Sequence, residues 1–365
     1  MTTNAVLEVD RSRCGETRVV EQELEPLGPG QVRLRVDRFA LTANNVTYAV
    51  LGDMLGYWDF FPTGDPAWGR VPAMGWADVV ESTHPDIATG GRCYGWFPMA
   101  RFADLTASPT ADGLRDDGDH RQAHAPVYRS YVDTARDAMY PGGATGDDLG
   151  DAEDRHALLR GLFLTSFLAD TALADADHHG ADAVVVLSAS AKTAIGFAQR
   201  TAERGVRSFG VTSPGNVDFV RSLGWYTDVL TYDDIPSLPQ VDAVSVDISG
   251  DGRSLAAVHD RFGDHLKHSM VIGKSHHDAP MAEVTAGPTP EFFFAPTEVS
   301  RRIAEWGADG FRRRSAEALE EFVAGSHHWL AVERSSGPAS AAATWSEVFD
   351  GAVAPSTGRI VSLHE

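Results

Sequence analysis

The chain has 365 residues, of which 43% are hydrophobic, and this is enough for two domains with buried cores. Its formal net charge of -21 disfavours nucleic acid and anionic membranes as partners, because both need clustered Lys and Arg. Two cysteines, Cys14 and Cys93, are too few for a disulfide framework or a structural zinc site, and without a roughly 20-residue apolar run or a secretory signal we expect a soluble, cytoplasmic protein.

The first part of the chain has the pattern of a small β-rich domain. Residues 31–39 alternate apolar and polar side chains and follow the turn-forming residues 26–30. Much of the acidity lies between Asp112 and Asp154, in segments with few apolar residues. We therefore expect a β-rich domain over residues 1–150, with a solvated acidic insertion at about 107–150.

The next part alternates helices and strands. Apolar residues recur at helical spacing from Leu158 to Ala174, and Ala183–Leu187 is an uninterrupted apolar run typical of a buried strand. Further helices are expected near 191–204, 216–223 and 254–262, and further strands near 208–211, 227–231, 241–247 and 267–273. This alternation predicts a parallel, doubly wound α/β sheet over residues 151–295. Residues 296–365 are expected to hold a long charged helix and a final strand that return to the first domain.

The order of these segments resembles the medium-chain dehydrogenase/reductases, in particular a zinc-free, quinone-reductase-like branch. The family's Gly-Pro-Gly-x-Val-x-Leu-x-Val motif is similar to residues 28–36, and its substrate-loop motif is similar to residues 41–48. The resemblance covers most of the chain outside about 107–150 and points to an uncharacterised branch, DUF2855. It implies a GroES-like substrate domain, a Rossmann domain that binds a nicotinamide dinucleotide, and a homodimer.

The turn after the strand 183–187 differs from the family's glycine-rich turn. Its sequence, Ser-Ala-Ser-Ala-Lys-Thr, offers the hydroxyls of Ser188, Ser190 and Thr193 and the charge of Lys192 at a helix start, where a pyrophosphate would bind. The alternative is a Ser-capped helix start without a ligand. The glycines that flank a Walker-type lysine are absent, so nucleotide hydrolysis is not expected.

The choice of cofactor depends on the end of the next strand. NAD-specific Rossmann domains place an acidic residue there, and residues 211–213 contain none. Ser213, Asn216 and Arg221 could instead hold a 2'-phosphate, which favours NADPH. The alternative is a turn followed by a helix cap.

The resemblance adds three further cofactor residues, and the residues themselves argue against two other kinds of site. It places Tyr232 near the adenine, and Gly273 and Lys274 beneath the nicotinamide, although a tyrosine that ends a strand is often structural. A serine-hydrolase turn is incomplete at residues 273–277. No metal is expected, because adjacent histidines diverge and the family's zinc-ligand pattern is replaced at residues 75–77.

A zinc-free reductase needs a group that stabilises or protonates the developing oxyanion. Tyr48 and Asn45 match family positions near the nicotinamide or the substrate, and Tyr128 is a second candidate, beside an Arg129 that could hold an acidic substrate. The alternative is a tyrosine buried in a β-rich core. The aromatic residues between 57 and 68 could line a flat hydrophobic substrate site.

The leading hypothesis is an NADPH-dependent oxidoreductase that reduces an activated alkene or carbonyl of a small molecule without zinc. One alternative is a non-catalytic NADP(H)-binding sensor or scaffold. Another is an isomerase or lyase that uses the same fold without net redox chemistry.

Overall fold

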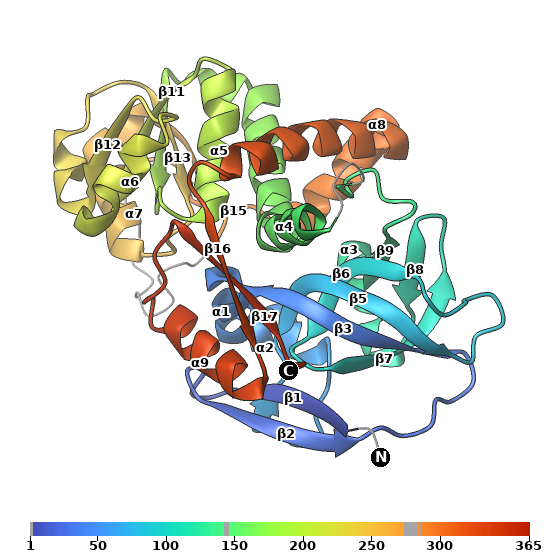
Figure 1. Ribbon diagram of the computed structural model, residues 1–365. Helices are drawn as coiled ribbons and strands as arrows, with labels where there is room; N and C mark the ends of the chain where they lie inside the picture. The colour runs from blue at the N-terminus through green and yellow to red at the C-terminus, as the bar shows by residue number, and fades with distance from the viewer. Residues whose placement is uncertain (1–2, 142–145, 274–283, 285) are drawn as a thin grey trace. The chain divides into compact units, whose positions relative to one another are not determined.

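The computed structural model describes residues 3–141, 146–273, 284 and 286–365 (Figure 1). It divides into two compact units, unit 1 (Met1–Leu158 and Leu330–Glu365) and unit 2 (Leu159–Trp329). The chain enters unit 2 within helix α4 (Asp147–Asp175) and leaves it after α8 (Ala295–Ser326). The expected boundary at residue 295 therefore differs from the observed one, because α8 packs within unit 2, where Phe322 stacks on Phe163 at 4.8 Å.

Unit 1 is built mainly from β-strands. They are β1 (Thr3–Asp10), β2 (Thr17–Glu23), β3 (Gln31–Leu41), β4 (Trp68–Gly69), β5 (Pro72–Ser82), β6 (Arg92–Pro98), β7 (Phe102–Pro109), β8 (Gly113–Asp116), β9 (Ser130–Asp133), β16 (Ala331–Ser336) and β17 (Thr357–Ser362). One sheet has the order β2-β1-β4, and the other has the order β16-β17-β3-β5-β6-β9-β8-β7. Because β3 also pairs with β7, part of the second sheet closes into a barrel. Its strands, in order around the barrel, are β3, β5, β6, β9, β8 and β7.

Short helices connect these strands. They are α1 (Ala43–Val50), α2 (Gly52–Leu55), α3 (Pro126–Arg129), α9 (Pro338–Phe349) and the 3-10 helices Tyr57–Asp59 and Asp119–Arg121.

The expected solvated insertion at 107–150 is wrong for part of that segment, because it contains β8 and β9 of the barrel. Tyr131 of β9 is 1% exposed and donates a hydrogen bond to the carbonyl of Trp96. Gly113 permits the close pairing of β8 with β9, since a Cβ there would lie 2.2 Å from the carbonyl oxygen of Tyr131. Strands of four residues are too short to reveal a period of two among acidic residues.

Unit 2 contains one parallel sheet with helices around it. The strands are β10 (Ala183–Leu187), β11 (Arg207–Thr212), β12 (Asp228–Thr231), β13 (Ala243–Asp247), β14 (Leu266–Val271) and β15 (Glu291–Phe292); the helices besides α4 and α8 are α5 (Lys192–Glu203), α6 (Val217–Ser222), α7 (Gly252–Phe262) and the 3-10 helices Asp177–Gly180, Pro214–Asn216, Tyr232–Ser237 and Gly263–His265. The order β12-β11-β10-β13-β14-β15, with every pair parallel, is the Rossmann order 3-2-1-4-5-6. The predicted doubly wound sheet is therefore confirmed.

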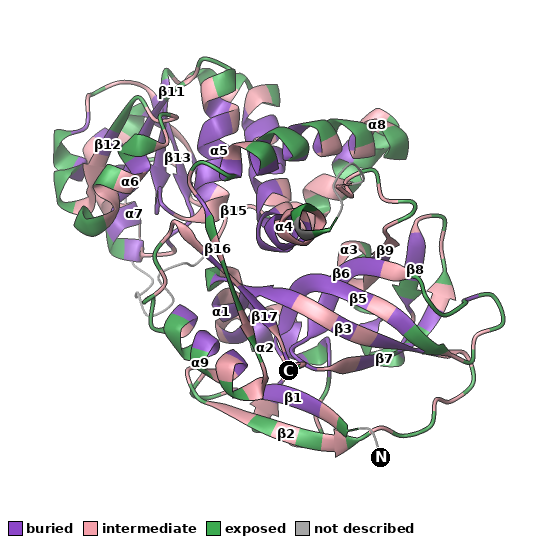
Figure 2. Ribbon diagram, viewed as in Figure 1, coloured by how far each residue is buried: buried purple, intermediate pink, exposed green. Residues whose placement is uncertain are grey.

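The core of unit 2 lies on both faces of this sheet. Val184 and Val186 of β10 share a buried cluster with Phe197 of α5, whereas Val185 and Leu187 share another with residues of α7. Figure 2 shows the central strands buried along their length. The uninterrupted apolar run of β10 has this cause, because both faces of a covered parallel strand are buried.

Helix α4 packs closely against α5 within unit 2. A Cβ at Gly196 of α5 would lie 3.0 Å from side-chain atoms of Phe163 and Ser166 in α4. The hydroxyl of Ser166 donates a 2.7 Å hydrogen bond to the carbonyl of Thr193. The missing side chain at Gly196 therefore permits the close packing of α5 on α4.

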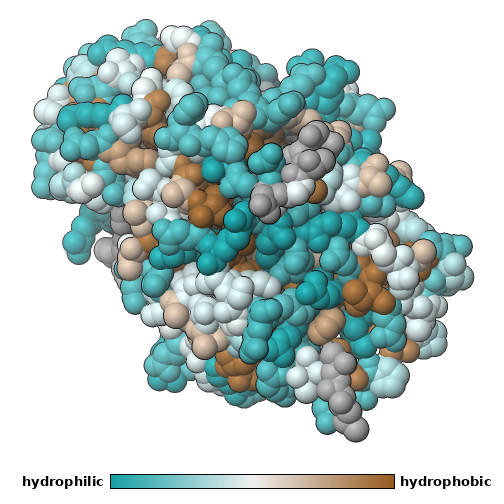
Figure 3. Space-filling view, viewed as in Figure 1, coloured by the Kyte–Doolittle hydropathy of each residue, from teal (hydrophilic) through white to brown (hydrophobic). Residues whose placement is uncertain are grey.

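The same helix meets the criteria for a membrane span. In the part of the chain that the structure describes, the segment Asp148–Asp175 of α4 is long and apolar enough to cross a bilayer, and 67% of its most apolar window is buried inside the protein. A core helix passes the same test, so the finding is weak evidence for a membrane. On the face shown in Figure 3, hydrophilic residues predominate and hydrophobic ones form small separate patches.

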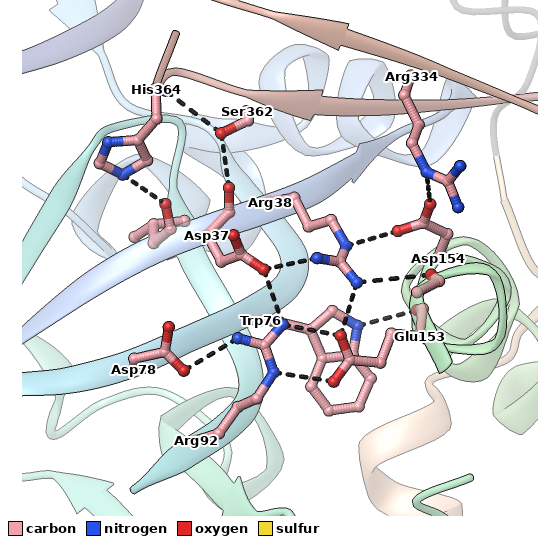
Figure 4. Close-up of polar contacts among 12 residues, drawn as sticks. Asp37, Arg38, Trp76, Asp78, Arg92, Glu153, Asp154, Arg334, Ser362 and His364 are labelled. Carbon is pink, nitrogen blue, oxygen red and sulfur yellow. Dashed lines mark hydrogen bonds and ion pairs between the residues drawn. The ribbon is translucent and has the colours of Figure 1, made fainter. Parts of the chain in front are cut away.

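A buried network of ion pairs holds the start of α4 in unit 1 (Figure 4). Glu153 and Asp154 are 3% and 0% exposed, and Arg38 reaches both carboxylates at 2.6 Å. Arg92 donates to both carboxylate oxygens of Glu153 at 2.8 Å, and the indole of Trp76 donates to the backbone carbonyl of Glu153 at 2.9 Å. One glutamate therefore joins β3, β5 and β6 to α4.

We predict that Glu153→Gln lowers the free energy of unfolding by about 3 kcal/mol, because it leaves two largely buried guanidinium groups without their shared carboxylate. Glu81→Gln is the matched control, since Glu81 pairs with Arg33 at 2.9 Å but is half exposed, and it should cost less than about 1 kcal/mol. Urea unfolding followed by fluorescence measures both losses. Equal losses in the two variants would contradict this interpretation of the network.

Candidate functional site

The strand order of unit 2 reverses between β10 and β13, and the two strands end side by side. Leu187 of β10 pairs with Asp247 of β13, and the amide of Ile248 donates to the carbonyl of Leu187 at 3.4 Å. In open parallel sheets, ligands bind outside the carboxyl ends of the strands at such a reversal. The residues that follow β10 and β13 are therefore the first candidates for a cofactor site.

The turn after β10 has a sharply bent backbone. Ser188 has φ +62°, in the left-handed region that non-glycine residues seldom adopt. Two backbone hydrogen bonds of 2.9 Å hold the turn, from Ala189 to Val211 and from Ala191 back to Ser188. Such conformations persist where the surrounding structure enforces them, and they are common at ligand sites. The turn thus keeps, without glycine, a bend that glycine adopts easily.

Ser190 is joined to the end of the neighbouring strand. Its hydroxyl oxygen accepts hydrogen bonds from the hydroxyl of Thr212 and from the side-chain amide of Asn216, each at 3.2 Å. Because this oxygen accepts two hydrogen bonds, the O–H of Ser190 must point to a different acceptor. The structure thus brings together Ser190 and Asn216, which the sequence assigned to separate phosphates, and adds Thr212, which the sequence analysis missed.

The first turn of α5 carries the predicted cation. Lys192 and Thr193 are half-buried at the N-terminus of this helix. Burial lowers the pKa of Lys192 to about 8, which leaves it mainly protonated at pH 7. A poorly hydrated ammonium group at a helix N-terminus favours an anion, because its charge adds to the helix dipole.

Tyr232 and two acidic residues lie around the same turn. The hydroxyl of Tyr232 is hydrogen-bonded to Ser188, and its pKa is raised by burial and by Asp247. Burial also raises the pKa of Asp247 to about 6, although that carboxylate accepts bonds of 2.8 and 2.6 Å from the amide and hydroxyl of Ser249. Asp251 caps the N-terminus of α7 nearby. Neither acid was predicted from the sequence, where the only signal is that Asp247 ends a buried strand and Asp251 follows it.

The remaining predicted cofactor residues differ in their surroundings. Ser213 is half-buried directly before the 3-10 helix Pro214–Asn216. Arg221 is exposed and donates to the carbonyl of Val229 at 3.0 Å, which ties α6 to β12. Gly273 follows β14, where a Cβ would lie 3.5 Å from the carbonyl oxygen of Ile248 at the end of β13. Lys274 lies outside the described residues.

Unit 1 brings three tyrosines together, and we call Tyr48, Tyr57 and Tyr128 the tyrosine cluster. The rings of Tyr48 and Tyr57 are 4.5 Å apart, and the hydroxyls of Tyr57 and Tyr128 are 3.4 Å apart. The indole of Trp96 donates to the hydroxyl of Tyr48 at 3.3 Å. Burial raises the pKa of all three hydroxyls, so each stays protonated and can donate a hydrogen bond. Tyr48 and Tyr128, predicted as separate candidates, are thus connected through Tyr57.

Asn45, the third predicted catalytic residue, has a structural role. It is 1% exposed, and its side-chain oxygen accepts from the amide of Thr42 at 2.8 Å in a capping box at the start of α1. Its side-chain nitrogen donates to the carbonyl of Pro72 at 3.0 Å. Both ends of the amide group are therefore engaged by the backbone of unit 1.

The described residues offer no obvious metal site. Among residues 3–141, 146–273, 284 and 286–365, no group of three or more His, Cys, Asp or Glu side chains is arranged to hold a metal ion. Burial raises the pKa of Cys93 to about 12, so this thiol is unreactive at neutral pH. The pair His276 and His277 lies outside the described residues.

Comparisons with solved structures place this fold. The chain is similar to the yhdH oxidoreductase of Salmonella enterica in complex with NADP (18% identity, 98% of this chain and 99% of that chain, TM-score 0.55). It is also similar to CurA of Vibrio vulnificus in complex with NADPH (14%, 96% and 94%, 0.60) and to Etr1p in a complex with NADP and crotonyl-CoA (12%, 99% and 100%, 0.56). At these identities the likeness is one of fold, that of the medium-chain dehydrogenase/reductases.

No curated protein matches the sequence of this chain. A family model described as "Protein of unknown function (DUF2855)" matches residues 39–354, which is most of the sequence. The chain therefore belongs to the DUF2855 family, as the resemblance predicted, and has the fold of a medium-chain dehydrogenase/reductase.

Proposed function

We propose that this protein is an NADPH-dependent oxidoreductase that reduces an activated alkene or carbonyl without zinc. The proposal is based mainly on the cluster of polar side chains at the reversal of strand order in unit 2. There the strained turn at Ser188 places Ser190 beside Thr212 and Asn216 at the carboxyl edge of the sheet. This is the edge at which Rossmann folds hold a dinucleotide.

The residues at this edge fit a phosphorylated dinucleotide. Lys192 and the amides at the start of α5 would hold the pyrophosphate, in place of a glycine-rich turn. The O–H of Ser190, directed away by its two donors, and the side chains of Ser213 and Asn216 would hold the 2'-phosphate. Strand β11 ends in Thr212 and has no carboxylate to repel that phosphate. The NADP and NADPH named with similar structures support the same choice.

NADPH, when bound, would supply a hydride to an electrophilic carbon of the substrate. The chain itself would supply a neutral hydroxyl that donates to the oxygen on which negative charge develops. Tyr48 is our candidate, because the indole of Trp96 fixes its hydroxyl and burial keeps it protonated. The hydroxyl pair of Tyr57 and Tyr128 would orient the substrate beside it.

A non-catalytic NADP(H) sensor is the second candidate, because the glycine-rich turn of the resembling family is replaced. An isomerase or lyase on the same fold is the third. A reductase consumes NADPH faster when an enone, quinone or ketone is added, a sensor binds NADPH without such consumption, and an isomerase converts its substrate without net loss of NADPH.

We predict that Lys192→Ala weakens NADPH binding about tenfold or more, because it removes the only cation that the described structure places at the helix start beside Ser190. Lys267→Ala is the matched control, since Lys267 pairs with Asp242 on the surface, and its affinity should stay within about twofold of wild type. Fluorescence titration with NADPH measures both. Unchanged affinity in a folded Lys192→Ala protein would remove this lysine from the cofactor site.

For any substrate that the wild type reduces, Tyr48→Phe should lower kcat by about 100-fold while NADPH affinity changes little, because only the proton donor is lost. Tyr131→Phe removes another buried hydroxyl of the same unit, one that donates to the carbonyl of Trp96, and should leave kcat within about threefold. Steady-state rates of NADPH oxidation test both. Equal rates for Tyr48→Phe and wild type would show that the hydroxyl of Tyr48 is not the proton donor.

A further inference from the structure

Arg121 is a buried cation beside the tyrosine cluster. It ends the 3-10 helix Asp119–Arg121 and is 0% exposed. One terminal nitrogen, Nη2, donates to the backbone carbonyl of Tyr128, whose side-chain hydroxyl meets that of Tyr57. The guanidinium therefore lies about one tyrosine side chain away from the hydroxyls of the cluster.

The hydrogen bonds of this guanidinium are incomplete. Nε lies 3.3 Å from a carboxylate oxygen of Asp116, but not in hydrogen-bonding geometry. Among the described residues, Nε and Nη1 of Arg121 have no hydrogen-bond partner, and both atoms are buried. A buried donor without an acceptor is costly and rare in folded proteins, so an additional acceptor placed at these two nitrogens would be stabilised. Burial accordingly lowers the pKa of Arg121.

Aromatic rings surround the same group. The central carbon of the guanidinium lies 4.3 Å from the ring centre of Phe60 and 5.2 Å from that of Phe61. The ring of Phe60 is 5.2 Å from that of Tyr128 and 4.3 Å from that of His124. Because Tyr128 and His124 are half-buried, the cluster reaches the surface on their side. The rings offer apolar faces to a flat ligand that carries one polar end.

The other charges around Arg121 are already used or neutralised. Arg129, the cation expected from the sequence to hold an acidic substrate, donates to the carbonyl of Asp116 at 2.9 Å and to the carboxylate of Asp117 at 2.6 Å. Asp116 faces Arg121, and Asp59 faces His124. Arg121 is therefore the cation here whose donors remain open toward an additional acceptor.

We propose that an unpartnered N–H donor of Arg121 binds a carboxylate of the substrate. This inference rests on the proposed function, since it takes the tyrosine cluster as the place of reaction. The substrate is then an unsaturated or carbonyl-containing carboxylic acid, with its acid on Arg121, its apolar body against Phe60 and Phe61, and its reacting group at the tyrosine hydroxyls. A hydrogen bond from a guanidinium N–H to a carboxylate is charge-assisted and therefore stronger than one to a neutral acceptor.

The test compares acids with their neutral isosteres. Titration calorimetry measures binding of benzoate and 3-phenylpropionate to the wild type, alongside benzamide and 3-phenylpropionamide. Each acid should bind about tenfold or more tightly than its amide, because only the acid offers a charged acceptor. Equal affinity of acid and amide, or no binding of either acid, would overturn the proposal.

Arg121→Gln should abolish this preference. The matched control is Arg115→Gln, which removes an arginine of the same region that is half exposed and paired with Asp117, and should keep the preference. A folded Arg121→Gln protein that still binds the acids more tightly than their amides would contradict the proposal. If that variant does not fold, carbon-13 NMR of carboxyl-labelled benzoate on the wild type replaces it: the carboxyl pKa should fall on binding, and an unchanged pKa would be the contrary result.

NADPH is titrated into the same preparations, because the two proposals fail in different ways. If the wild type binds NADPH but shows no preference for the acids, only the assignment of Arg121 is contradicted. If the protein binds the acids but not NADPH, the proposed reductase function is contradicted, and the carboxylate site in unit 1 remains supported.

Discussion

The candidate cofactor site depends on the reversal of strand order between β10 and β13. Since all strands of this sheet are parallel, their carboxyl ends meet at one edge, and the reversal leaves the ends of β10 and β13 without a crossing helix between them. This arrangement sets Ser188 beside Tyr232 and brings Ser190 within hydrogen-bonding distance of Thr212. No other place in the described part of unit 2 combines a strained turn, a helix start and a half-buried lysine.

Unit 1 depends on a different interaction, the buried carboxylates at the start of α4. Glu153 and Asp154 are nearly or fully covered, and the guanidinium groups of Arg38 and Arg92 provide the countercharge. Removing two carboxylates from water is costly, and it is repaid only when every acceptor finds a donor. The gain is specificity, because Glu153 contacts side chains of three barrel strands in one arrangement. That arrangement fixes the point at which the chain leaves unit 1 through α4.

The regular parts of the fold could be predicted from the sequence, because their signals are local. The apolar run 183–187 and the helix after it identified the first strand-helix-strand unit of the sheet, within a residue or two of β10 and α5. Strands β8 and β9 were missed, because each has only four residues and β9 is placed by its pairing with β6, much earlier in the sequence. The tail after residue 330 also holds α9 and β16, which the sequence analysis did not identify.

Single residues of the candidate site could be predicted from the sequence, but the contacts between them could not. Ser190 and Asn216 were chosen for their types and positions, but the hydrogen bond between them joins residues that are 26 apart. The side-chain nitrogen of Asn45 bonds to the backbone of Pro72, 27 residues away, and the unpartnered donors of Arg121 follow from what surrounds them after folding. Such features arise from tertiary contacts, which no local pattern encodes.

The most direct test of the central claim is a fluorescence titration of the purified wild-type protein with NADPH and, separately, with NADH. We expect NADPH to bind with a Kd in the micromolar range and NADH to bind about tenfold or more weakly, because only NADPH carries the phosphate for Ser190 and Asn216. Binding of neither dinucleotide would contradict the assignment of this edge of the sheet as a cofactor site. Equal binding of both would contradict the role given to Ser190 and Asn216.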